Sequence, residues 1–184
     1  MLITIHTQAP HYTELRGNQM AAGATYVPIA TNTLGSSTAS VTFSSIPATY
    51  TDLVLVCSAK NTVAQNYEIW IRFNSDSGGN YSQTFLQNYA NSTQAGRNSS
   101  ITEIRPGKTN TTSFDTTIIN IQNYSNSTTY KTALNRYGNA EFVTGASVGL
   151  WRSTSAITSV QVICESSANF TSGSTFTLYG IAAA

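Results

Sequence analysis

Side chains that could perform chemistry are sparse in this sequence. Both histidines, His6 and His11, lie in an N-terminal segment without a clear strand or helix pattern. A serine hydrolase needs a histidine held beside its nucleophile by a rigid scaffold, and the chain has no GxSxG turn. A zinc site needs about four Cys, His, Asp or Glu ligands at short spacings, and no cysteine lies near either histidine. The residues therefore favour neither a hydrolase triad nor a zinc centre.

Glycoside hydrolysis needs only two facing carboxylates. The candidates for such a pair are Glu68, Glu103, Glu141 and Glu165. The sequence leaves a pair open, but the chain has only eight acidic residues, and most are better interpreted as solvated or turn residues. We expect a protein that is not an enzyme and that carries no cofactor.

The segment Asn74–Asn80 (NSDSGGN) places oxygen ligands at alternate positions, as the start of a calcium loop does. The distal bidentate glutamate of such a loop is missing. Asn, Asp and Gly are also the residues of tight turns, because they supply side-chain hydrogen bonds and positive φ. We expect an Asx-rich turn here and no metal site.

Aromatic side chains among amide and hydroxyl residues can stack on sugar rings. Trp70 lies on the polar face of its expected strand, and Tyr89 and Tyr124 are expected in polar loops. These three residues are the candidate glycan contacts. The alternative for Trp70 is packing on a second sheet or at a subunit interface.

Short alternating segments, which position these side chains, follow one another from Tyr26 onward. The clearest is Tyr67–Phe73, whose odd-numbered residues are apolar, and Asp52–Ala59 is apolar on both faces, as a covered central strand is. The remaining expected strands are Tyr26–Ala30 (with Pro28 marking an edge), Ser40–Ser44, Tyr81–Gln87, Ile101–Ile104, Phe114–Ile121, Tyr130–Tyr137, Phe142–Arg152, Ile157–Glu165 and Thr175–Ile181. Residues 88–112 are otherwise polar, with a turn expected at Pro106-Gly107. The pattern predicts an all-β fold, an antiparallel β-sandwich that is jelly-roll-like.

Residues 1–20 differ from the rest of the chain. Ile3, Ile5, Tyr12 and Leu15 are costly to leave in water, so an arm that docks on a neighbour is favoured over a mobile tail. Met20, followed by AAGATY, is a second plausible start. The expected organisation is an N-terminal arm over 1–20 and a β-sandwich domain over 21–184.

Charged residues make up 9% of the 184 residues, and the net charge is +1. The nine Lys and Arg residues form no basic patch, so we expect no nucleic-acid binding. No apolar run approaches the roughly 18 residues of a membrane helix, and no basic-then-apolar leader is present, so we expect neither membrane insertion nor a secretory signal. Cys57 and Cys164 each lie in an expected strand, where two buried core residues are favoured over a disulfide.

Four stretches together resemble one family. They are TNTLGSSTASVTFSSIPATYTDLVLV (31–56), IRFNSDSGGNYSQTFL (71–86), GLWRSTSAITSVQV (149–162) and FTSGSTFTLYGI (170–181). They resemble the small β-sandwich virion proteins of tailed bacteriophages, including many cyanophages, which are structural, decoration or tail-fibre proteins. The resemblance covers residues 26–184, does not cover residues 1–20, and carries no catalytic motif.

The resemblance implies a capsid decoration (cement) protein on the outer surface of the virion, made in the host cytoplasm. We expect a homo-oligomer, with a trimer as the expected number, whose arm reaches a neighbouring subunit or the major capsid protein. The alternative is a tail-fibre or tail-tip module that binds host surface glycan. A third hypothesis is a free carbohydrate-binding or hydrolytic protein that is absent from virions.

Overall fold

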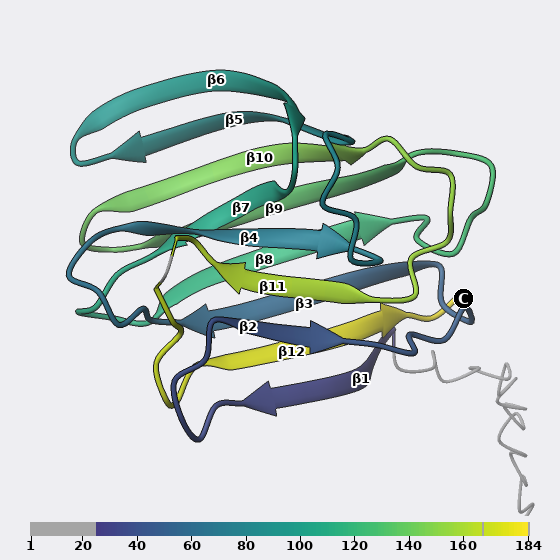
Figure 1. Ribbon diagram of the computed structural model, residues 1–184, viewed down its shortest axis with the longest axis horizontal. Coiled ribbons are helices and arrows are strands. Elements are labelled where there is room, and N and C mark those ends of the chain that lie inside the picture. The colour runs from purple at the N-terminus through teal and green to yellow at the C-terminus, as the bar shows by residue number, and fades with distance from the viewer. Residues whose placement is uncertain (1–24, 167, 184) are drawn as a thin grey trace, which may run out of the picture.

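The computed structural model describes residues 25–166 and 168–183, which form twelve β-strands in two sheets (Figure 1). The strands are β1 (Tyr26–Thr33), β2 (Ser40–Phe43), β3 (Asp52–Ala59), β4 (Tyr67–Phe73), β5 (Tyr81–Tyr89), β6 (Ser92–Ile101), β7 (Ile104–Thr109), β8 (Asp115–Gln122), β9 (Lys131–Asn139), β10 (Val143–Trp151), β11 (Val160–Cys164) and β12 (Thr175–Ile181). The described part of the chain contains no helix with the length and apolar character that a bilayer crossing requires. The expected arm, with Ile3, Ile5, Tyr12 and Leu15, lies outside the described residues.

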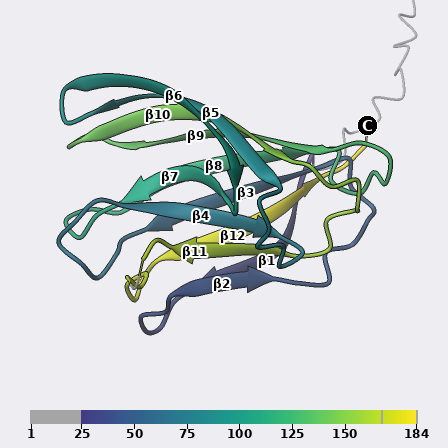
Figure 2. The same ribbon diagram turned by 45° about the horizontal axis from the view of Figure 1, so that its top comes forward.

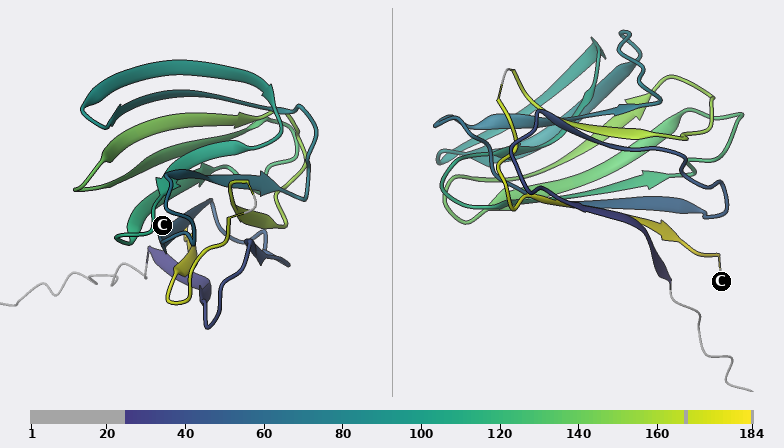
Figure 3. Two further views of the ribbon diagram at one scale, coloured as in Figure 1. Left: turned by 60° about the vertical axis from the view of Figure 1, so that its left-hand side comes forward. Right: turned by 60° about the horizontal axis from the view of Figure 1, so that its bottom comes forward.

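The two sheets have the strand orders β1-β12-β3-β8-β9-β10-β5-β6 and β2-β11-β4-β7. Without the hairpins β5–β6 and β9–β10, the orders become β1-β12-β3-β8 and β2-β11-β4-β7. This is the arrangement of an eight-stranded jelly roll. The two hairpins are insertions that extend one sheet past the edge of the other (Figures 2 and 3). The expected all-β, jelly-roll-like antiparallel sandwich is confirmed, and we call β5, β6, β9 and β10 the inserted strands.

Alternation of side chains explains why these segments pair as strands. In β4, Ile69, Ile71 and Phe73 point into the core and are fully buried, whereas the even-numbered residues of the strand point outward and are half-buried. β3 lies inside the eight-stranded sheet between β12 and β8, as its apolar sequence predicts. β1 lies at the edge of this sheet, where a proline without a backbone N–H is tolerated, and its pairing with β12 is irregular between Pro28 and Ala30.

The expected turn at Pro106-Gly107 is wrong, because both residues lie inside β7. β7 is an edge strand, which tolerates a proline without a backbone N–H. Gly107 is required by packing, since a Cβ at this position would overlap Oγ1 of Thr117 in the facing sheet. Residues 88–112 are also more regular than expected, because they contain β6 and β7 in place of one short strand.

The two cysteines are free and buried, as the interpretation as core residues predicts. Cys57 lies on β3 in one sheet and Cys164 on β11 in the other. Burial raises the pKa of both thiols, that of Cys164 to about 11. Both therefore stay protonated and act as small apolar side chains.

β7 lies over β8, β9 and β10 at very short range. A Cβ at Gly149 in β10 would lie 2.5 Å from Cγ2 of Ile104, which is fully buried. A Cβ at Gly145 would lie 2.6 Å from the hydroxyl oxygen of Tyr137. The missing side chain at Gly149 therefore allows the small sheet to reach the inserted strands, whereas the one missing at Gly145 leaves room for Tyr137 of the neighbouring strand β9.

We predict that Gly149→Ala destabilises the protein by about 1–3 kcal/mol, because the added methyl group overlaps Ile104. The matched control is Gly35→Ala, whose added Cβ would meet nothing within 4 Å. The control should change the free energy of unfolding by less than about 0.5 kcal/mol. Urea unfolding of the three proteins measures this, and equal stability of Gly149→Ala and wild type would contradict the packing described for β7.

Candidate functional site

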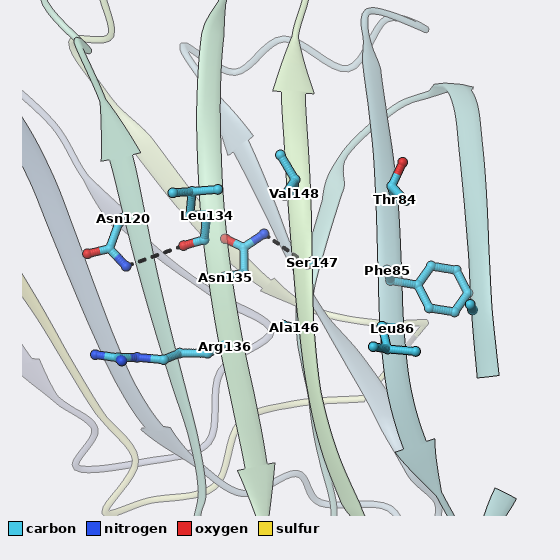
Figure 4. Close-up of a pocket in the computed structure, with 11 residues that line it drawn as sticks. Thr84, Phe85, Leu86, Asn120, Leu134, Asn135, Arg136, Ala146, Ser147 and Val148 are labelled. Carbon is cyan, nitrogen blue, oxygen red and sulfur yellow. Dashed lines mark hydrogen bonds between the residues drawn. The ribbon is translucent and has the colours of Figure 1, made fainter. Parts of the chain in front are cut away.

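Apolar side chains gather on the inserted strands, on the sheet face that points away from the four-stranded sheet. Leu86, Leu134 and Val148 are 59%, 39% and 47% exposed. The strand register pairs Val148 with Leu134 and places Leu86 between Ala146 and Ala95. These pairings form two rows of side chains across the strands (Figure 4). We call Leu86, Ala95, Leu134, Ala146 and Val148 the outer apolar face.

The outer apolar face is hollowed, with a volume of about 770 Å³. A second hollow of about 310 Å³ extends it toward β1, and Asn120 and Leu134 line both. The larger hollow contains a single charged residue, Arg136, which cannot form an acid–base pair by itself. A broad apolar surface of this kind suits contact with another macromolecule better than catalysis.

A second site lies on the inner side of the same strands, where they extend past the edge of β7. It is a cleft of about 130 Å³ between β4 and β7 on one side and β5, β6 and β9 on the other. Its lining residues are Glu68, Gln83, Phe85, Gln87, Asn98, Arg105, Gly107, Lys108 and Tyr137. We call this site the inner cleft. Its lining is mainly polar, in contrast to the outer apolar face.

Ion pairs join β4 and β7 at the rim of the inner cleft. Glu103 is 2% exposed and pairs with Arg105 at 3.0 Å and with Arg72 at 3.4 Å. Glu68 pairs with both Arg105 and Lys108 at 3.4 Å. Each of the three cations therefore has a carboxylate partner within this network.

The floor of the inner cleft consists of amides and a phenol. Gln83 accepts a hydrogen bond from the backbone N–H of Arg105 at 2.8 Å through Oε1. Tyr137 donates its hydroxyl to Oε1 of Gln87 at 2.9 Å. Burial, with a smaller contribution from Glu68, raises the pKa of Tyr137 to about 12, so the phenol keeps its proton at neutral pH.

Two of the three predicted glycan contacts, Trp70 and Tyr89, lie beside this network. Trp70 points outward from β4 as predicted, with the guanidinium of Arg105 5.8 Å from its ring centre. The expected loop position of Tyr89 is wrong, because the residue ends β5. Tyr89 is half-buried, its hydroxyl accepts a hydrogen bond from Asn66, and Nζ of Lys108 lies 5.4 Å from its ring centre. A cation therefore covers part of each ring.

The third predicted glycan contact, Tyr124, is wrong, because its side chain is not exposed. Tyr124 is fully buried in the core, and its hydroxyl donates to the backbone oxygen of Pro47. The polar letters around it, YSNST, gave no signal of this, because its partners lie more than 70 residues away in the sequence. Tyr124 is not available to a ligand in this fold.

The segment Asn74–Asn80 forms an Asx-rich turn, as expected. The carboxylate of Asp76 accepts hydrogen bonds from Gly78 N–H at 2.8 Å, Asn80 Nδ2 at 2.9 Å and Trp151 Nε1 at 2.7 Å. Burial alone would raise the pKa of Asp76, but these hydrogen bonds bring it below its usual value. No group of three or more His, Cys, Asp or Glu side chains is placed to hold a metal ion within residues 25–166 and 168–183.

The four glutamates considered for hydrolysis have structural partners. Glu68 and Glu103 share the guanidinium of Arg105, which separates and neutralises them. Glu165 accepts the backbone N–H of Glu68 at 2.7 Å, and Glu141 accepts the hydroxyl of Thr112 at 2.7 Å. The absence of enzymatic activity stays a prediction.

Sequence reasoning did not identify the outer apolar face or the inner cleft. The alternation in Tyr81–Tyr89 contains part of the signal, since Gln83 and Gln87 lie on one side of β5 and Leu86 on the other. The strands that flank β5 depend on two insertions whose pairing no local pattern specifies. The rows on the outer face arise only from that register.

One buried carboxylate lies outside both sites. Asp115, at the start of β8, is fully buried and accepts hydrogen bonds from the backbone N–H of Asn110 at 2.8 Å and from Asn139 Nδ2. Burial raises the pKa of Asp115 to about 6, against the opposing effect of these hydrogen bonds. We interpret the group as structural, because both oxygens hold neighbouring segments of the sheet.

The pKa of Asp115 predicts a pH dependence of stability. The folded protein binds more protons than the unfolded chain between about pH 4 and pH 6. The contribution of protonated Asp115 to the free energy of unfolding is therefore complete below about pH 4 and is lost as the pH rises through about 6. Asp115→Asn resembles the protonated acid and should gain up to about 3 kcal/mol relative to wild type between about pH 4 and pH 7. Urea unfolding of wild type and Asp115→Asn at about pH 4 and at about pH 7 measures this difference in the free energy of unfolding. A difference that does not change with pH would contradict the raised pKa.

The chain was also compared with known proteins. No protein-family model and no curated protein sequence matches it.

Proposed function

We propose that this protein is a non-enzymatic virion structural protein of a tailed bacteriophage, and specifically a capsid decoration protein on the outer shell. The resemblance of its sequence to phage virion proteins supports the class of protein. The outer apolar face is the structural observation that supports assembly. Its partners are other copies of this chain and the major capsid protein.

The outer apolar face is suited to bury against a second copy of the chain. Single exposed apolar residues are common on soluble proteins, but Leu86, Leu134 and Val148 lie on three adjacent strands and share one surface. Ala95 and Ala146 leave gaps on both sides of Leu86, into which the side chains of a partner can pack. The net charge of +1 causes little repulsion between copies.

Assembly through this face also fits a particle that is exposed to changing salt. The contact is apolar and contains one guanidinium, so it depends little on screened charge pairs. A decoration protein assembled in this way would keep its contacts at high and low ionic strength.

We predict that Leu134→Asp combined with Val148→Asp produces a monomer, because two carboxylates would be buried without partners in the contact. The matched control is Tyr130→Asp, since Tyr130 is 54% exposed but lies in the loop before β9 and outside both sheets. Light scattering coupled to size-exclusion chromatography measures the oligomer, and far-UV circular dichroism verifies that each variant is folded. A monomeric wild type, or a double variant of unchanged mass, would overturn assembly through this face.

The location in the virion is a separate prediction. Immunogold microscopy of purified phage should label the head densely, and gel densitometry should give hundreds of copies per particle. Label on the tail with a few copies would favour the tail-fibre or tail-tip alternative. Absence from the virion would overturn the proposal.

A further inference from the structure

We infer that the inner cleft is a binding site for a neutral, hydroxyl-rich ligand, of the chemical class of a single saccharide unit. This inference goes beyond a role in assembly, because the cleft and the outer apolar face lie on opposite sides of the same inserted strands. Three features of the cleft support it: an amide donor without a partner among the described residues, a set of cations that are already held in ion pairs, and an apolar ring beside them.

The first feature is the side chain of Gln83. The residue is 5% exposed, and its Oε1 is held by the backbone N–H of Arg105 at 2.8 Å. That bond directs the amide toward β7, and its Nε2 donates to no residue within the described parts of the chain. The side chain lines the cleft, where Nε2 can donate to a ligand. A ligand oxygen would satisfy this donor.

The second feature is that each cation at the rim is already held in an ion pair, although one net positive charge remains. Arg72, Arg105 and Lys108 contribute three positive charges, and Glu68 and Glu103 hold all three cations in ion pairs. An anionic ligand would meet Glu68 at the rim, and a cationic ligand would meet Arg105 and Lys108. A neutral hydroxyl can donate to Glu68 and accept from the amides, so it fits both kinds of group without displacing an ion pair.

The third feature is the apolar ring of Phe85, which lines the cleft next to the amides. The ring is half-buried and lies against Gly96 of β6, where a Cβ would be 2.8 Å from its Cζ. Because Gly96 has no side chain, the ring of Phe85 can lie at this position on the cleft wall. A pyranose has a hydroxyl edge and an apolar C–H face, which match Gln83 and Phe85 respectively.

The size of the cleft limits the ligand. A volume of about 130 Å³ exceeds the ~30 Å³ of one water molecule. It is smaller than the roughly 300 Å³ at which pockets for larger molecules begin. One sugar residue, inserted by an edge, is the occupant that fits, and the rest of a longer glycan would extend over Trp70 and Tyr89 at the rim.

The test is a titration of the full chain with single sugars, monitored by two-dimensional ¹⁵N NMR of the side-chain amides. Glucose, galactose, mannose, rhamnose and N-acetylglucosamine are each added up to about 50 mM, since so few contacts correspond to millimolar affinity. We expect at least one sugar to shift the Nε2 resonance of Gln83 in a saturable way. No saturable shift with any of the five sugars would overturn the inference. Tighter binding of glucuronate than of glucose would overturn the neutral character of the ligand.

Gln83→Glu is the matched variant, because it retains an oxygen for the N–H of Arg105 and removes the Nε2 donor. The variant should bind the sugar that binds wild type at least tenfold more weakly. The amide resonances of Gln87 report this binding. Unchanged affinity would overturn the assignment of the donor. The wild-type titration locates the ligand by itself if this variant does not fold. Leu134→Asp with Val148→Asp should bind the sugar as wild type does, so a failure of assembly and a failure of ligand binding are distinguishable.

Discussion

The close contact between β7 and the inserted strands determines what the rest of the molecule can do. β7 is the last strand of the four-stranded sheet, and Gly107 and Gly149 remove the side chains that would hold it away from the larger sheet. Ile104 can then fill the space over β10 and close the core at this edge. Beyond β7 none of the described strands faces the larger sheet, and the inner side of β5 carries Gln83 and Gln87 where a core would need apolar residues.

The jelly roll and its insertions therefore have different tasks. The eight strands of the jelly roll contain most of the fully buried apolar residues, whereas the inserted strands present two surfaces of opposite chemistry. One surface is apolar and broad, and the other is polar and narrow. Because each strand of the insertion has one side on each surface, a single pair of hairpins can serve assembly and recognition together.

The fold was largely predictable from the sequence, because its signals are local. The alternation in Tyr67–Phe73 and the apolar run in Asp52–Ala59 depend only on neighbouring residues, and the structure agrees with both. Pro106-Gly107 was misinterpreted because the reason for the glycine is Thr117 in the opposite sheet. Tyr124 was misinterpreted for the same physical cause, since Pro47 and Tyr50 bury it from a distant part of the chain. The candidate sites depend on strand register between insertions, which local patterns do not contain.

The position of β12 has a consequence for the order in which the chain folds. β12, the last of the described strands, lies between β1 and β3, and β1 pairs with no other strand in the part of the chain that the structure describes. During synthesis β1 must therefore wait unpaired until nearly the whole domain has left the ribosome, while the β5–β6 and β9–β10 hairpins can form from adjacent residues. Closure of the sheet is then a late, long-range step. Truncated chains that lack β12 would expose the edge of β3 and would be prone to aggregate.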